Sequence, residues 1–196
     1  MAVNVIPFSM PAPMEIPSHI VEMLSGMEPG EAVCKGMELL MGIDAADAMV
    51  YERIAGDGTL HLHAVRSGDG RSGELERTLG QESFYGRPLG EDARSTAAAA
   101  FEKNSPLLIM GESSGDGDGP LPPGLGKVIL GGSDSGNVGF VYVLPLSGAG
   151  DRPLGALTLI RAQKNGPLNH EQPNIAEAMR QLLGRLLDRQ RPAGSG

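Results

Sequence analysis

The chain has 196 residues, and 16 Lys and Arg against 24 Asp and Glu give it a formal net charge of −8. This length fits one domain that buries a core without disulfides, and the single Cys34 excludes an internal disulfide or a paired-cysteine zinc site. The acidic balance and the scattered basic residues argue against nucleic acid and anionic membranes as partners. No apolar run has the length of a membrane span, and the first residues do not resemble a secretion signal, so we expect a cytoplasmic protein.

Composition divides the chain into an arm, one domain and a tail. Residues 1–14 carry three prolines, which remove backbone donors and favour extended conformations, so we expect a flexible arm there. Residues 191–196 form a similarly flexible tail. Residues 15–190 are therefore predicted to form a single domain.

The domain begins with a predicted helical hairpin at residues 16–42. Its two helices are separated by Glu28-Pro29-Gly30, a sequence that interrupts a helix. In the second helix, apolar residues recur at helical spacing and predict a buried stripe, with Cys34 beside it. The members of this stripe are Val33, Met37, Leu40 and Met41.

A β-hairpin follows at residues 48–54 and 59–66, because Gly56-Asp57-Gly58 supports a tight turn. Alternation in the second strand predicts two faces, one with Leu60, Leu62 and Ala64 and the other with His61, His63 and Val65. Residues 67–90 are rich in Gly, Ser and charge, so we expect an irregular connection outside the core.

The second half of the chain predicts two further helices and three strands. Residues 91–103 read as a helix that Asn104 closes, and residues 107–110 as a strand. Residues 111–136 predict a long structureless insert. A second, central hairpin and a long amphipathic helix follow, at residues 139–146, 154–161 and 169–189. Asn169 and Gln172 have the spacing of a helix-opening cap.

This order of elements predicts an α+β fold, in which terminal helices cover one face of an antiparallel sheet. Residues from about 30 to 188 also resemble a GAF domain, a regulatory sensor module. Three segments in the family's order carry the resemblance. They are Gly42-Ile43-Asp44-Ala45-Ala46-Asp47-Ala48-Met49-Val50-Tyr51, Pro88-Leu89-Gly90-Glu91-Asp92 through Ser105-Pro106-Leu107, and Val143-Leu144-Pro145-Leu146 with Pro153-Leu154-Gly155-Ala156-Leu157-Thr158-Leu159. The related PAS fold is the alternative.

The resemblance implies a six-stranded sheet with the N- and C-terminal helices on one face and a helix and loop roof over the other. Family members hold ligands under that roof, which here corresponds to residues 67–138. We expect a ligand-binding wall that includes Phe140 or Tyr142 from the central strand and Arg94 and Phe101 from the roofing helix. The alternatives are a roof that merely closes the domain, core positions for the two strand aromatics, and a surface ion pair for Arg94.

The resemblance also bears on whether the protein is an enzyme. Some small GAF proteins resemble free methionine-R-sulfoxide reductases, whose pocket loops carry cysteines, and here those loops have none. We expect Cys34 to be a buried, unreactive thiol and the protein not to be an enzyme. The late Cys of pigment-binding members and the Asn-Lys-Phe-Asp-Glu signature of cyclic-nucleotide-binding members are also missing.

Other motifs favour structural readings. Residues 68–73 spell GxGxxG, but we expect neither a parallel βαβ unit nor a helix opening at Gly73, so dinucleotide binding is rejected. His61 and His63 could share a metal, and Asp116 and Asp118 could bind calcium, but neither pair has the remaining ligands at suitable spacing. No metal site is predicted, and the identity of any cofactor stays unknown.

We therefore predict a non-catalytic sensor or regulatory domain of bacterial signal transduction, which binds a small molecule and signals through a partner protein or a homodimer. The dimer would use the terminal helices, with Leu183 and Leu187 facing outward; otherwise all six apolar positions of the last helix cover the sheet. The alternative function is a ligand-free dimerisation or protein-interaction module. A closed apolar pocket with a few polar groups favours the sensor, and an exposed apolar helix stripe favours the module.

Overall fold

The computed structural model describes residues 3–9, 12–55, 60–79, 100, 104–111, 125–130, 137–169 and 171–189. Their strands form one six-stranded sheet in the order β1-β4-β5-β6-β2-β3, and every neighbouring pair is antiparallel. The strands are β1 (Val3–Pro7), β2 (Ala48–Ile54), β3 (Leu60–Ser67), β4 (Leu107–Gly111), β5 (Val138–Ser147) and β6 (Pro153–Ala162). The helices are α1 (Ser18–Ser25), α2 (Pro29–Gly42), α3 (Ser72–Leu79), α5 (Leu125–Leu130) and α6 (Gln172–Asp188), with short 3₁₀ turns at Ala149–Asp151 and Gln163–Asn165.

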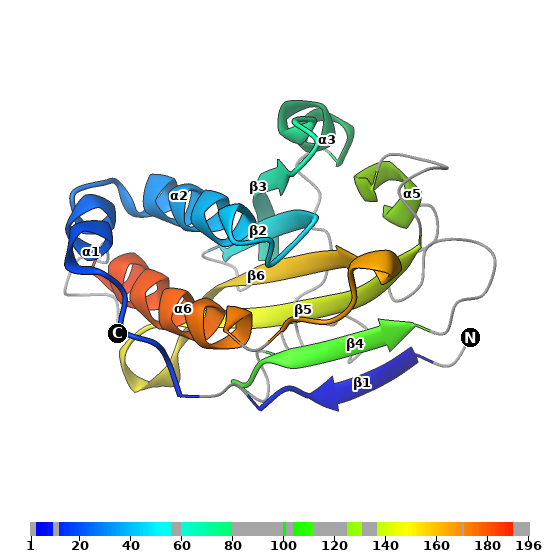
Figure 1. The fold of residues 1–196 in the computed structure, drawn as a ribbon. Helices are drawn as coiled ribbons and strands as arrows, with labels where there is room; N and C mark the ends of the chain where they lie inside the picture. Colours follow the sequence, from blue (N-terminus) through cyan, green and yellow to red (C-terminus); the bar gives the residue numbers. More distant parts are fainter. Residues whose placement is uncertain are drawn as a thin grey trace.

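The helices lie on two sides of the sheet (Figure 1). One side, which we call the helix face, packs against α1, α2 and α6. The opposite side, which we call the roof face, packs against Leu75 of α3, Ile129 and Leu130 of α5, and Ala100. The α+β architecture with a six-stranded antiparallel sheet and terminal helices on one face is confirmed.

The hairpin of β5 and β6 occupies the centre of the sheet, as predicted. Its residues pair from Val138 with Ala162 to Ser147 with Pro153. The run from Val141 to Leu146 is buried throughout because both faces of this strand are covered. A continuous apolar sequence rather than an alternating one is the pattern such a strand requires.

Close packing between α2 and α6 organises the helix face. Pro29 opens α2, where its missing N–H costs nothing. Gly36 lies in the contact: a Cβ there would stand 2.9 Å from Cδ1 of Leu183 and 3.2 Å from the sulfur of Met179. Any larger residue at this position would therefore require the side chains of Leu183 and Met179 to shift.

The apolar stripe of α6 is turned inward. Leu183 is 0% exposed and Leu187 is 5% exposed, and both belong to the helix-face core. The prediction that they face outward is wrong, because α2 and the sheet together cover the whole apolar arc of the helix. The helix begins at Gln172 after Glu171, so Asn169 is not its cap, although its backbone N–H donates to Oε1 of Gln172 at 3.0 Å.

The first residues of the chain hold a strand that the sequence did not predict. Val3–Pro7 pairs with β4 along one edge of the sheet. Phe8 continues the connection, since its N–H donates to the carbonyl of Pro106 at 2.9 Å. The extended conformation that prolines favour is also the conformation of an edge strand, which is why the composition of an arm concealed a β-strand.

The first hairpin is confirmed, but the face assignment within β3 is wrong. Tyr51 pairs with Ala64 and Glu52 with Leu62, which leaves His63 as the extra residue of a β-bulge. The bulge reverses the alternation at that point. Leu60, Leu62 and Val65 consequently belong to the roof face, while Ala64 belongs to the helix face.

Two segments predicted to be irregular contain helices. The connection after β3 holds α3, whose Leu75 is buried, and the long insert holds α5. The hairpin turn at residues 56–58 and the helix predicted at residues 91–103, apart from Ala100, lie outside the described residues. Among the helices that are described, none is long and apolar enough to cross a membrane.

Candidate functional site

The roof face carries a polar pair at its centre. Glu52 of β2 and Thr158 of β6 are both 0% exposed. Each lies two residues from a member of the roof-face core, Val50 in β2 and Ala156 in β6, so both side chains point to that face. The register pairs Val50 with Thr158 and Glu52 with Ala156, which makes Glu52 and Thr158 diagonal neighbours, roughly 7–8 Å apart along the sheet.

The surroundings of this pair are aliphatic. Ala48, Val50, Ala156 and Ile160 are its neighbours on β2 and β6, and all are fully buried. The hydroxyl of Thr158 has no hydrogen-bond partner in the part of the chain that the structure describes. A buried polar atom left in this way costs about 1–3 kcal/mol, so it calls for an explanation.

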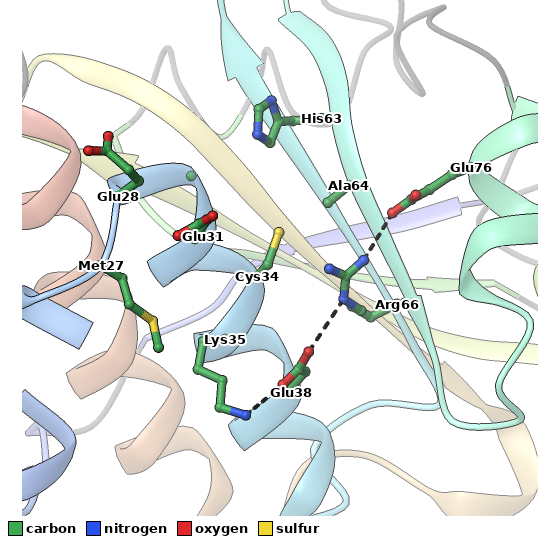
Figure 2. A pocket seen from close by; sticks show the side chains of 11 residues that line it. Met27, Glu28, Glu31, Cys34, Lys35, Glu38, His63, Ala64, Arg66 and Glu76 are labelled. Carbon is green, nitrogen blue, oxygen red and sulfur yellow. Dashed lines mark hydrogen bonds and ion pairs between the residues drawn. The ribbon is translucent and has the colours of Figure 1, made fainter. Parts of the chain in front are cut away.

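The helix face presents a groove (Figure 2). A groove of about 610 Å³ runs between α2 and β3, with the sulfur of Cys34 on its floor and His63 at one end. Its remaining lining residues are Met27, Glu28, Gly30, Glu31, Lys35, Glu38, Ala64, Arg66 and Glu76.

The cations of this groove are already paired with carboxylates. Nζ of Lys35 lies 2.8 Å from Oε2 of Glu38, and Nη1 of Arg66 lies 2.9 Å from Oε1 of Glu76. Nε of Arg66 also approaches Oε1 of Glu38 at 3.9 Å, so the pairs form the continuous chain drawn in Figure 2. These side chains are partly exposed, and such pairs contribute little stability. They leave neither basic side chain free to bind an anion.

Cys34 is half-buried in the groove rather than fully buried. Burial raises the pKa of its thiol, an effect that nearby Arg66 only partly offsets. The thiol form is therefore favoured, and a thiol is a poor nucleophile.

His63 closes the groove against the sheet. Its ring meets Tyr51 edge-on with centroids 5.1 Å apart. Burial lowers the pKa of the imidazole, and the nearby guanidinium of Arg53 lowers it further. Among the described residues, no three His, Cys, Asp or Glu side chains are grouped to hold a metal. Asp116 and Asp118 lie outside those residues.

The structure places the two predicted strand aromatics on the helix face. Phe140 and Tyr142 belong to the helix face, and the alternate residues Val141 and Val143 face the roof instead. Tyr142 packs edge-on against Phe8 at 5.1 Å, and its hydroxyl accepts the N–H of Leu168 at 2.9 Å. Neither ring can line a cavity under the roof. Arg94 and Phe101 lie outside the described residues.

Sequence reasoning missed Glu52 and Thr158, although a signal for one of them was present. Glu52 is the one acid of the strand Ala48–Ile54, and the four residues that precede it in the strand are apolar or aromatic and buried. A charged residue within such a strand is uncommon unless its carboxylate has a specific partner. Thr158 gave no signal, since threonine is ordinary in a strand.

With this geometry in place, the class of fold can be named: the chain has the GAF fold. Similar solved structures include the GAF domain/HD domain protein from Geobacter sulfurreducens, with a TM-score of 0.58 and 16% identity over 86% of this chain and 98% of that chain. A GAF domain region from Geobacter sulfurreducens PCA gives 0.56 and 15% identity, over 85% and 97% of the two chains.

A third similar structure is the GAF domain of a phosphoenolpyruvate-protein phosphotransferase from Coxiella burnetii, with a TM-score of 0.54 and 17% identity over 85% of this chain and 87% of that chain. No protein-family model and no curated protein matches the sequence. Identities this low establish the fold, and the function must be argued from this chain's own residues.

Proposed function

We propose that this domain is a non-catalytic sensor that binds a small molecule between the roof face of its sheet and the segment at residues 67–138. The observation that carries the proposal is the buried hydroxyl of Thr158 beside the carboxylate of Glu52 on an apolar face. Small-molecule sites are typically apolar with a few polar groups that fix orientation. A bound molecule that hydrogen-bonds Thr158 would remove the cost of burying its hydroxyl.

The small side chains around the pair support the same location. Ala48 and Ala156 leave more room above the sheet than leucine or a ring would. The GAF fold is that of a sensor module in many signalling proteins, which is consistent with this use of the roof face. The protein would then act in the cytoplasm of a bacterium, where it reports its ligand to a partner protein or a second copy.

A catalytic role of the methionine sulfoxide reductase type has little support. Cys34 is the one cysteine of the sequence, and it lies in the groove on the helix face, across the sheet from Thr158. Its raised pKa also disfavours the thiolate that such chemistry needs. The module alternative has lost the outward leucines on which it depended, because Leu183 and Leu187 are buried.

Native mass spectrometry of the protein purified from its own host tests the proposal, followed by denaturing extraction to identify any released molecule. We expect a stoichiometric adduct in the wild type and its loss in Thr158→Val, which removes the hydroxyl while keeping the shape. Thr78→Val is the matched control, because Thr78 lies exposed on α3. Circular dichroism verifies that both variants fold.

Two outcomes would count against the proposal. A wild type without any adduct would favour the ligand-free interaction module. An adduct retained equally in Thr158→Val and Thr78→Val would show that the molecule binds elsewhere.

A further inference from the structure

The segment that spells GxGxxG forms a closed turn between β3 and α3. Gly70 has φ +82°, a conformation that glycine adopts without strain. The backbone N–H of Ser67 donates to Oγ of Ser72 at 3.0 Å, which fixes the start of α3 against the end of β3. The N–H of Gly68 donates to the carbonyl of Asp47 at 3.0 Å, so the turn is also attached to β2.

Within this turn, Asp69 orients Arg71. Its Oδ2 accepts Nε–H of Arg71 at 2.5 Å, and its Oδ1 accepts the backbone N–H of Arg71 at 3.1 Å and the hydroxyl of Ser67. Burial raises the pKa of the Asp69 carboxyl, but these hydrogen bonds outweigh it and the net shift is downward. Asp69 therefore stays charged, and it holds the guanidinium in a single direction.

The other nitrogens of Arg71 reach across the chain to α5. Nη1 donates to the carbonyl of Val128 at 3.1 Å, and Nη2 donates to the carbonyl of Ile129 at 3.0 Å. Both carbonyls lie in the last turn of α5. Because the helix ends at Leu130, it contains no N–H four residues further on that could donate to either carbonyl. Arg71 thus supplies the C-terminal cap of α5, with its positive charge at the negative end of the helix dipole.

This geometry also shows why the string is not a phosphate-binding loop. A helix does open at Ser72, contrary to the expectation from sequence, so that ground for rejecting the motif was wrong. The sheet is nevertheless antiparallel. In addition, the Asp69 carboxylate lies in the turn and is hydrogen-bonded to the guanidinium of Arg71. A phosphate here would meet a like charge and a cation that is already engaged.

We propose that Arg71 is a positioning residue that holds α5 against the roof face, and that its release sets how fast a molecule enters and leaves the roof site. The second half of this inference rests on the proposed function. α5 packs on the roof face through Ile129 and Leu130, both buried. A pocket of about 450 Å³ adjoins these two residues and Asp69, so freeing α5 would open the roof at that point.

The first test is hydrogen exchange of the full chain, comparing Arg71→Gln with Arg77→Gln. Arg77 lies on α3 and donates to the carbonyl of Gly73 at 3.1 Å, so it gives the same charge change at a residue whose hydrogen bond stays within its own helix. We expect amides of residues 125–130 to exchange at least about tenfold faster in Arg71→Gln, as for the loss of one charge-assisted hydrogen bond. Arg77→Gln should match the wild type there.

Amides of β5 and β6 separate positioning from general destabilisation. In Arg71→Gln they should exchange as in the wild type, because neither strand depends on the turn. Asp69→Asn, which keeps Arg71 but weakens its anchor, should give an intermediate rate in α5, and Arg71→Lys should restore part of the protection. Unchanged α5 exchange in Arg71→Gln, or an equal increase in β5 and β6, would overturn the positioning role.

The second test uses anilinonaphthalene sulfonate, a fluorescent apolar probe, in stopped-flow mixing with the same proteins. We expect uptake to be several times faster in Arg71→Gln than in Arg77→Gln. Faster α5 exchange with unchanged uptake would overturn the gating half alone. Absence of any adduct in native mass spectrometry would remove the proposed sensor function, while the exchange result would still decide whether Arg71 positions α5.

Discussion

The two faces of the sheet are filled in different ways. The helix face takes the rings of Phe8, Tyr51, Phe140 and Tyr142 beneath α1, α2 and α6. The roof face carries no aromatic ring among the residues that the structure describes, and its centre holds alanines, valines and an isoleucine around a carboxylate and a hydroxyl. The helix face is thus filled by aromatic rings, whereas the roof face is filled by aliphatic side chains around a polar pair.

The contrast is not complete, because one ring on the helix face also buries a polar atom. The hydroxyl of Tyr51 has no partner among the described residues, and burial raises its pKa to about 12. Its polar neighbour is the imidazole of His63, at the edge of the helix face, whereas Thr158 has the carboxylate of Glu52 as its diagonal neighbour on the sheet. Three predictions test how sharp the difference between the faces is.

The largest effect is expected on the helix face. Leu183→Ala removes a fully buried side chain that packs against α2, so the free energy of unfolding should fall by about 2–5 kcal/mol. Met23→Ala, on the exposed side of α1, should change it by no more than about 0.5 kcal/mol. Urea denaturation measures both changes. A small effect of Leu183→Ala would indicate that Leu183 faces outward after all.

A smaller effect on the free energy of unfolding is expected on the roof face, where a hydroxyl is replaced by a methyl group in one variant and the reverse in another. Thr158→Val should leave the ligand-free protein as stable or up to about 1 kcal/mol more stable, since an unpartnered hydroxyl is removed. Val143→Thr, the reverse change on the same face, should destabilise it by about 1–3 kcal/mol. Chemical denaturation of ligand-free protein distinguishes the two signs, and a marked loss of stability in Thr158→Val would show that the hydroxyl has a partner within the protein.

The smallest effect is a pH dependence at the edge of the helix face. Burial and then Arg53 lower the pKa of His63 in the folded protein, while Glu76 acts in the opposite direction. A lowered histidine pKa means that the unfolded chain takes up the proton first. Its contribution to stability is therefore complete above the ordinary value of about 6.5 and is lost as the pH falls below it.

Denaturant midpoints for the wild type and His63→Gln, measured between about pH 7.5 and pH 5, test this dependence. The wild type should lose more stability than the variant over this range. Parallel curves would mean that His63 has the same pKa in the folded and unfolded protein.

Local patterns were sufficient for most of the fold. Helical spacing found α2 and α6, and glycine turns between apolar runs found both hairpins. The helices α3 and α5 were not predicted, because the segments that contain them are rich in glycine. Both helices are short, and contacts distant in sequence, such as the hydrogen bond from Arg71 to the carbonyl of Val128, are not visible in a local pattern. The bulge at His63 could not be predicted either, because the register of β3 depends on its pairing with β2 and not on the residues of β3 alone.

The candidate site was harder to predict than the fold. Side chains alternate between the two faces of a strand, so Phe140 and Tyr142 lie opposite Val141 and Val143. Alternation does not show which pair faces the helices when both faces are covered. The rings of Phe140 and Tyr142 were expected on the face toward the roof. The structure gives that face to Val141 and Val143 and to Glu52, whose charge inside an apolar strand was a sequence signal that had been overlooked.

The edges of the sheet limit how this protein can associate. An open strand edge invites a second chain to add to the sheet, which is a common route to aggregation. β3 interrupts that edge with the bulge at His63, and β1 is only five residues long and ends at Pro7, which has no N–H to offer. Strand addition is therefore disfavoured at both margins of the sheet, which limits association to contacts between side chains of its covered faces and helices.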